Sequence, residues 1–203
     1  MKKFFVILTL LIWTKILGQT EEIYRLTFTD KSNFKLTTLL DHRLPKTFFI
    51  IDTTDDWNSN SFWLTDFDNK DKEQVIKSIQ NDEHNPYFHS YLFSDTVLNK
   101  LFSDKEKQML CKKSKALKSK PIHLNGSNYK TIASSKNIKG FYFVTSEPII
   151  SEDKKFAFID LTVFYKETYK QSLNETYFGT IGIVFQRQGK SWKRIAKKDW
   201  LIL

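Results

Sequence analysis

The chain has one cysteine, Cys111, so an internal disulfide is excluded. A protein of 203 residues without disulfides must be stabilised by its hydrophobic core, and a hydrophobic content of 40% is enough to build one. Leu110 and Lys112 flank the cysteine on a polar, helix-like stretch that lacks the signature of a nucleophilic thiol. We therefore expect Cys111 to be a packed, structural side chain.

Motifs that mark common enzymes and cofactor sites are also missing. There is no GxSxG elbow, no P-loop, no GxGxxG fingerprint and no paired-cysteine zinc signature. HExxH is absent, and His84 and His89 do not have the three- or four-residue spacing of metal ligands on a helix. The acid-rich stretch 52–68 does not fit an EF-hand, because the fifth position from Asp66 is Lys70. We expect no cofactor and no metal, and we interpret all four histidines as surface or interfacial residues: His42, His84, His89 and His123.

The first twenty residues contain no acid, and they have the three-part layout of a secretory signal peptide. Two lysines precede an apolar run, and small or polar residues follow it. A membrane anchor is the competing interpretation, but a spanning helix needs about 20 apolar residues and Lys15 interrupts this run. We predict export to the periplasm or the medium, with cleavage near Gly18 or Gln19. Residues 1–19 are then the signal peptide, and residues 20–203 form a single α+β domain without stable membrane insertion.

The net charge is +9 for the whole chain and falls to +6 without residues 1–19, which hold three lysines and no acid. Many of the remaining lysines lie in residues 105–120, where no aromatic residue accompanies them. Nucleic-acid binding surfaces combine such charges with stacking aromatics or base-reading side chains, so we do not expect a nucleic-acid partner. A solvated helix face is our interpretation, and weak attraction to anionic polymers or lipid headgroups is the functional alternative.

The last third of the chain predicts an antiparallel meander of four strands. Strands are expected at residues 140–146, 155–165, 177–187 and from 191 onward, with a hairpin turn at residues 188–190. In the second of these strands one face is apolar throughout and the other is apolar but interrupted, which is typical of a central strand. Gly179 and Gly182 suggest a bend or bulge in the third strand.

Helical patterns precede these strands, so the fold class we predict is α+β, with helices packed on the four-stranded meander. Helices are expected over residues 71–80, 94–101 and 103–117, and short strands that extend the sheet at residues 47–51 and 61–64. Ser103 and Glu106 match a capping box at the start of the last helix. Met109, Leu110 and Leu117 are expected on its inward side, which would cover one face of the sheet.

Asp160 is the most unusual residue of this pattern, because it stands in the middle of an apolar strand. A carboxylate in such a place must be paired, hydrogen-bonded or open to a cavity, since burying it alone is unfavourable. One interpretation is that Asp160 is solvent-accessible or meets Arg187 or Arg194 on a neighbouring strand. The other is a polar group on the floor of a sheet-lined pocket. Our candidate ligand-binding residues are Asp160, Phe158, Tyr165, Tyr177 and Arg187.

Two C-terminal segments, SEPIISEDKKFAFIDLTVFY and GTIGIVFQRQGKSWKRIAKKDW, resemble part of a loose group of uncharacterised exported bacterial proteins. In that group a Ser-x-Pro-Ile segment, two strands and a Gly-Lys-x-Trp-Lys turn follow one another. The residues that carry the likeness are Ser146, Pro148, Ile149, Gly189, Lys190, Trp192 and Lys193. The resemblance implies export and a small sheet domain with a C-terminal antiparallel meander, and it carries over no catalytic residue.

The order of elements also resembles that of nuclear transport factor 2-like domains. These place helices before a curved antiparallel sheet and often end in a Gly-Lys-Trp hairpin, to which Gly189, Lys190 and Trp192 correspond here. The resemblance implies a cone that holds a small ligand or an enzyme site. Our first hypothesis is a non-enzymatic exported protein that binds a protein partner or a small ligand through its sheet or loops. The alternative is a small-molecule-binding or enzymatic cone with Asp160 on its inner face.

Overall fold

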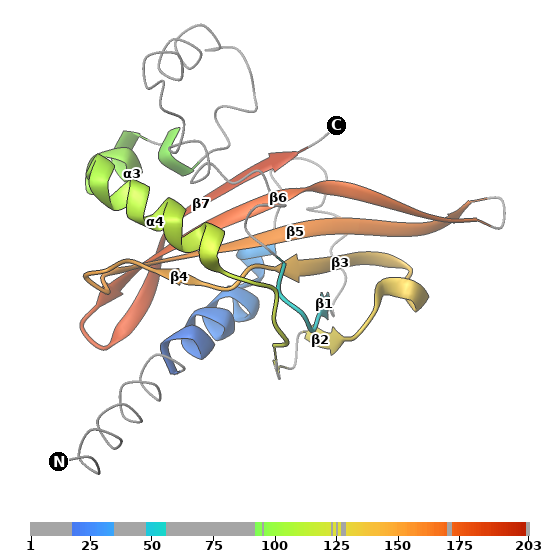
Figure 1. The fold of residues 1–203 in the computed structure, drawn as a ribbon. Helices are drawn as coiled ribbons and strands as arrows, with labels where there is room; N and C mark the ends of the chain where they lie inside the picture. The colour runs from blue at the N-terminus through green and yellow to red at the C-terminus, as the bar shows by residue number, and fades with distance from the viewer. Residues whose placement is uncertain are drawn as a thin grey trace, which may run out of the picture.

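A seven-stranded sheet lies at the centre of the fold, and helices pack against both of its faces (Figure 1). The computed structural model describes residues 18–34, 48–55, 92–94, 96–122, 124, 126, 129–169 and 172–201. The strands are β1 (Phe48–Ile51), β2 (Tyr129–Ile132), β3 (Gly140–Thr145), β4 (Ile149–Ile150), β5 (Phe156–Tyr169), β6 (Ser172–Gln188) and β7 (Ser191–Leu201). They follow the order β2-β1-β3-β5-β6-β7, and β4 pairs with β5. The α+β prediction is confirmed, with a larger sheet than the predicted four-stranded meander.

The strands β3, β5, β6 and β7 pair antiparallel in succession, in the predicted C-terminal region. β5 lies between β3 and β6 and enters a hydrophobic core on each face, which explains its nearly continuous apolar sequence. The β6–β7 hairpin turns at Gly189 and Lys190, and Gly189 has a φ of 63°, a conformation that favours glycine.

β1 and β2 add a parallel part to the sheet, which the sequence pattern did not indicate. β1 lies within the predicted strand 47–51 and pairs in parallel with both β2 and β3. β2 has the sequence YKTI, which is too short to show an alternation. Several predictions lie outside the described residues, namely the strand at 61–64, the helix at 71–80, the acid-rich stretch beyond residue 55 and the four histidines.

Two β-bulges change which side chains share a face of the sheet. Phe178 is the extra residue of β6, next to Gly179, where the sequence suggests a bend. Ile195 is the extra residue of β7, because its neighbours Arg194 and Ala196 pair with consecutive residues of β6. Each extra residue shifts the alternation of its strand by one position, so residues beyond it face the opposite way from a regular strand.

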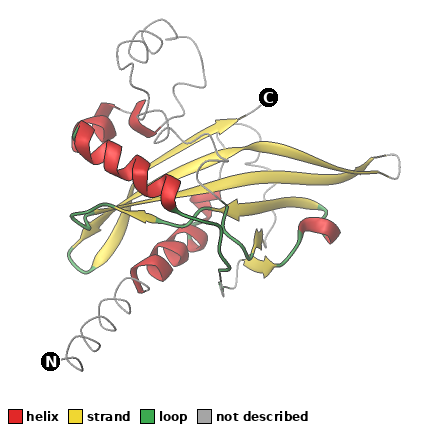
Figure 2. Ribbon diagram, viewed as in Figure 1, coloured by secondary structure: helices red, strands yellow, loops and turns green. Residues whose placement is uncertain are grey.

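One face of the sheet, the N-terminal face, is covered by a helix over residues 18–29 and the 3-10 turn η1 (Lys31–Phe34) (Figure 2). Ile23 and Phe34 are fully buried in this core, and the ring of Phe34 lies 4.9 Å from that of Phe143 in β3. The sequence pattern does not indicate this helix, because the apolar residues of the segment directly follow the apolar run of the predicted signal peptide. The segment nevertheless supplies a large part of one core.

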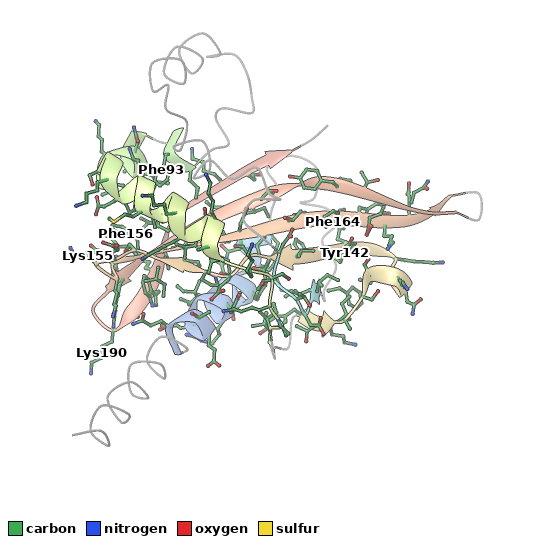
Figure 3. The ribbon with its side chains drawn as sticks, in the orientation of Figure 1. Phe93, Tyr142, Lys155, Phe156, Phe164 and Lys190 are labelled. Atoms are coloured by element: carbon green, nitrogen blue, oxygen red, sulfur yellow. The ribbon has the colours of Figure 1, made fainter. Side chains whose placement is uncertain are left out.

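The opposite face, the α4 face, is covered by helices in the region where the sequence predicts them. These are the 3-10 turn η5 (Leu92–Ser94), α3 (Thr96–Leu101) and α4 (Asp104–Ala116). Phe93 and Phe102 pack edge to face, with ring centroids 5.6 Å apart, and Phe102 also lies 4.7 Å from Phe156 of β5. Figure 3 shows Phe93 and Phe156 where α3 and α4 cover the sheet. Within the described ranges, no helix is long and apolar enough to cross a membrane.

The predicted capping box opens α4. The backbone N–H of Glu106 donates to Ser103 Oγ at 3.3 Å, and the N–H of Ser103 donates to the Glu106 carboxylate at 2.7 Å. These two bonds satisfy amides that have no partner within the helix. Leu110 is buried and Leu117 packs beside it, as predicted, whereas Met109 is only partly buried. A third 3-10 turn, η6 (Ser135–Asn137), precedes β3.

Candidate functional site

Asp160 lies at the middle of β5 on the α4 face, and its exposed fraction is 0%. The alternation of β5 puts it on the same face as Phe158 and Thr162. The interpretation that Asp160 is solvent-accessible is therefore wrong, because neighbouring elements cover both faces of the strand. A carboxylate at this depth needs stabilising interactions, which makes the surroundings of Asp160 the first place to look for a function.

Ser146, at the end of β3, holds the backbone of Asp160 with its side chain. The Asp160 N–H donates to Ser146 Oγ at 2.9 Å, and the Ser146 N–H donates to the Asp160 carbonyl at 2.9 Å. The Ser146 carbonyl instead accepts a bond from the Tyr24 hydroxyl at 3.3 Å. The serine hydroxyl thus takes the place of a main-chain acceptor, and the freed carbonyl binds the N-terminal helix. Sequence analysis singled out Ser146 within the Ser-x-Pro-Ile segment but assigned it no role.

Four polar residues form a strip across the α4 face, which we call the polar strip: Asp160, Thr162, Thr180 and Lys198. Asp160 and Lys198 both pair with Gly182, one on each side of it, and Thr162 pairs with Thr180. Gly182 has no side chain, so none stands between Asp160 and Lys198 in this row of the sheet, and their Cα atoms are two strand spacings, ~10 Å, apart. The strip combines a buried carboxylate, two buried hydroxyls and a partly buried ammonium.

The bulge at Ile195 puts Lys198 on this face. A regular β7 with Arg194 on the N-terminal face would place residue 198 on that face too, since the two positions are four residues apart. The extra residue reverses this, so that Ala196 and Lys198 share the α4 face with Val184 and Gly182. Lys198 was missed because strict alternation assigns it to the wrong face.

Beside the polar strip lies a cluster of aromatic side chains, which we call the aromatic shelf: Tyr142, Phe164 and Tyr177. Figure 3 shows Tyr142 and Phe164 close together on the sheet, and their rings are stacked with centroids 5.1 Å apart. Phe164 and Tyr177 meet edge to face at 5.8 Å. Phe164 and Tyr177 are partly exposed. The Tyr177 and Thr180 hydroxyls lie 2.6 Å apart, so a hydrogen bond joins the shelf to the polar strip.

A charged cluster lies next to the aromatic shelf on the distal part of the β5–β6 hairpin, which we call the arm. The Tyr142 hydroxyl donates to the Glu175 carboxylate, and Lys166 Nζ lies 3.3 Å from the same carboxylate. Lys166 is buried and also donates to Ser135 Oγ at 3.0 Å. The hydrogen bond from Tyr142 and the nearby Lys166 together lower the pKa of Glu175, whereas burial and the Glu175 contact raise the pKa of Tyr142.

The structure brings together only part of the predicted ligand-binding set. Asp160 and Tyr177 lie on the α4 face and are connected through the polar strip. Phe158 shares this face but is fully buried, 5.4 Å from the ring of Phe102, so it belongs to the packed core. Tyr165 lies on the N-terminal face, where its ring is 4.7 Å from that of Phe141.

Arg187 and Arg194 also lie on the N-terminal face, away from the side chain of Asp160. The guanidinium of Arg187 is 6.0 Å from the ring of Trp192. Arg194 donates to Ser32 Oγ at 2.8 Å and is 3.2 Å from the Asp30 carboxylate. The predicted pairing of Asp160 with either arginine is therefore wrong. Both arginines share the N-terminal face with Phe185, whereas the side chain of Asp160 faces α4.

A second feature is a cavity of about 180 Å³ between α4 and the turn that joins β4 to β5. Its lining residues are Glu106, Met109, Leu110, Lys113, Ser151, Glu152 and Asp153. Most of its polar groups already have structural partners: Glu106 caps α4, Lys113 donates to the Ile150 carbonyl at 2.9 Å, and Asp153 accepts from Ser151 Oγ at 2.7 Å. The polar strip and aromatic shelf therefore form the stronger candidate site.

Across the part of the chain that the structure describes, no group of three or more His, Cys, Asp or Glu side chains is placed to hold a metal ion. Comparisons of the chain with protein-family models, with curated proteins and with solved structures found no match. The site is therefore interpreted from its own geometry.

Replacing the hydroxyl of Ser146 should test its structural role. In Ser146→Ala the buried Asp160 N–H loses its acceptor, so we expect the free energy of unfolding to fall by about 1–3 kcal/mol. Ser191→Ala is the matched control, because the exposed Ser191 hydroxyl bonds only to the Gln188 carbonyl, at 3.2 Å. Chemical denaturation measures both, and equal losses in the two variants would contradict the assignment.

Removing the Tyr142 hydroxyl should produce a pH-dependent loss of stability. The pKa of Glu175 is lowered in the fold from its ordinary value of 4.5, so the stabilisation is fully present above that value and disappears as the pH falls through the lower, folded-state pKa. We expect Tyr142→Phe to lower the free energy of unfolding by about 1 kcal/mol at neutral pH, since the carboxylate is partly exposed.

The difference between the wild type and Tyr142→Phe should shrink in acid, where Glu175 is protonated. Denaturation curves recorded from neutral to acidic pH measure it. Tyr165→Phe, on the opposite face, is the control and should change little at any pH. A loss that stays constant down to the lowest pH would rule out the carboxylate as the partner.

Proposed function

We propose that the chain is an exported, non-enzymatic protein that binds a small amphipathic molecule where the polar strip meets the aromatic shelf. The observation that carries the proposal is the junction of Thr180 with Tyr177, because it joins buried polar groups to partly exposed rings. Small-molecule sites combine apolar and aromatic walls with a few fixed polar groups. The shelf would contact the flat apolar part of the ligand, and the strip would face its polar head.

The polar groups suit a head that both donates and accepts hydrogen bonds. The carboxyl group of Asp160 supplies acceptors, Lys198 donates, and the hydroxyls of Thr162 and Thr180 do either. All four project from adjacent strands of a sheet, which keeps their spacing fixed. Rigid elements reduce the ordering that binding requires.

The order of the elements supports a likeness to nuclear transport factor 2-like domains. A helix, a strand, further helices and then the strands β2 to β7 follow one another along the described parts of the chain. The hairpin that the resemblance expects at Gly189, Lys190 and Trp192 is present. A sheet-lined cone with a small ligand is the function that such a likeness favours.

Binding is favoured over turnover by the distribution of titratable groups. Acid–base catalysis by a carboxylate commonly uses a second group at a suitable distance. On the described part of the α4 face, the next carboxylate along the meander is Glu175, which pairs with Lys166 rather than with Asp160. The enzymatic alternative would combine Asp160 with Lys198, the other titratable group of the polar strip.

Export is supported by the position of the first core residues. Ile23 is fully buried in the core of the N-terminal face, and it follows the predicted cleavage near Gly18 or Gln19. Cleavage there would leave Ile23, Tyr24 and Phe28 in the mature chain, so that the core of the N-terminal face stays complete.

Ligand binding should depend on the aromatic shelf. The probe is 8-anilinonaphthalene-1-sulfonate, an aromatic sulfonate whose fluorescence rises on binding. We expect it to bind the wild type, and we expect Tyr177→Leu to weaken its binding about tenfold. Tyr165→Leu is the matched control, because Tyr165 is a partly buried tyrosine of the same arm on the opposite face. Equal effects of the two substitutions would contradict the proposed site.

A natural ligand should also be detectable without a probe. Native mass spectrometry of the purified protein, before and after denaturing extraction, should reveal a bound small molecule in the wild type and less of it in Tyr177→Leu. Retention of the same adduct by Tyr177→Leu would place the ligand elsewhere.

The cleavage site gives an independent test of export. Expression of the full chain should release a protein whose intact mass corresponds to a start at residue 19 or 20. A truncated form that starts after Phe28 should not accumulate, because it lacks Ile23 and Phe28 of the core. Recovery of only the uncleaved mass, or stable accumulation of the truncated form, would contradict the proposal.

A further inference from the structure

Two turns meet at the end of the sheet opposite the arm of β5 and β6. One joins β4 to β5 at residues 151–155, and the other joins β6 to β7 at Gly189 and Lys190. The Arg187 N–H donates to the Lys155 carbonyl at 2.8 Å, which keeps the two turns side by side. Figure 3 shows Lys155 and Lys190 projecting at this end.

This end carries a concentration of positive charge, which we call the cationic end: Lys154, Lys155, Arg187, Lys190 and Lys193. All five residues are exposed. Two exposed acids, Glu152 and Asp153, share the end, and Glu106 of α4 lies beside them, so five cations against three acids leave a net charge of +2. Asp153 is already 3.2 Å from Lys155 Nζ, and it also accepts a bond from the Lys155 N–H at 3.0 Å.

We propose that the cationic end binds the surface of a membrane that contains anionic lipids, without inserting into it. This inference goes beyond the proposed ligand site and does not depend on it. Lysines and arginines near an anionic bilayer are attracted by its surface potential, and the contributions of several cations add. Four strands, β4 to β7, end at the two turns, so the cations project from one end of a rigid sheet rather than from a flexible tail.

The side chains around these cations favour a lipid surface over a nucleic acid. Single-stranded nucleic acids are bound by exposed aromatics that stack on the bases. The aromatic residues of this end, Phe156, Phe185 and Trp192, are all buried, and Trp192 lies beneath the guanidinium of Arg187. A surface with exposed cations and buried aromatics offers charge attraction without base stacking.

The lysines of α4 form the other basic region, and several of them have structural roles. Lys113 donates to the Ile150 carbonyl at 2.9 Å, and Lys120 pairs with Glu147. The exposed lysines that remain on α4 and just after it, Lys105, Lys112 and Lys118, are spread along the helix rather than gathered at one end. They provide a control with the same number of charges in a different place.

The test uses the full chain and two kinds of vesicle, one of phosphatidylcholine alone and one with about one third phosphatidylglycerol. On the anionic vesicles, each lost cation should weaken binding about fivefold. The N-terminal segment, which has three lysines of its own, is the same in every variant, so its contribution cancels when the variants are compared on the same vesicles. We expect the affinity for the anionic vesicles, measured by co-sedimentation, to fall about a hundredfold in the triple variant Lys154→Gln, Lys190→Gln, Lys193→Gln. The control Lys105→Gln, Lys112→Gln, Lys118→Gln should fall much less.

Two further measurements complete the test. Glu152→Gln should strengthen binding to the anionic vesicles about fivefold, and higher salt should weaken binding of the wild type. Thermal unfolding should be unchanged in the triple variant, since its three side chains are exposed. Equal losses in the triple variant and the control, or tighter binding of the cationic end to soluble polyphosphate than to the vesicles, would overturn the proposal.

Discussion

The burial of β5 on both of its faces is the constraint on which the rest of the structure depends. Ala157, Ile159 and Leu161 enter one core, and Phe156 and Phe158 enter the other. A strand with two apolar faces requires a cover on each side, because either face alone would leave its side chains in water. Here both covers come from earlier parts of the chain, residues 18–34 on one side and residues 92–116 on the other. Neither layer is optional for the stability of the sheet.

Between Phe156 and Phe164 the α4 face changes its character along β5, and the N-terminal face does not. Under α3 and α4 the face is packed with phenylalanines, at Asp160 and Thr162 it is buried and polar, and at Phe164 it is aromatic and partly exposed. On the N-terminal face the residues Ala157 to Val163 at alternate positions are all apolar and fully buried. A polar interruption confined to one face is more than a packing requirement, since an apolar residue at Asp160 would serve the core better. That asymmetry is the physical basis for placing the site there.

Much of the meander and the helical cover could be predicted because the signals are local. The alternation of β5, the turn at Gly189 and the capping box of Ser103 with Glu106 each depend on residues a few positions apart. The pairing of β1 with β2 and β3 could not be predicted, because it joins segments 80 or more residues apart in the sequence. The sequence YKTI of β2 is also too short to show a strand alternation. The site was predicted in part for the same reason. Asp160 is conspicuous within its own strand, whereas Lys198 reaches the site only through the bulge at Ile195.

The two proposed surfaces belong to different regions of the same strands, and this separation has a physical consequence. The polar strip lies on the α4 face, between the packed phenylalanines and the aromatic shelf, so any change in its size or charge is transmitted to packed neighbours. The cationic end lies on two turns, where its side chains are exposed and contribute charge without filling a core. Charge on the turns can therefore be altered with little effect on the fold, while the strip can be altered only together with the residues around it. The two proposed sites are therefore separated along β5 by its packed residues Phe156 and Phe158, and only the cationic end can change its charge independently of the core.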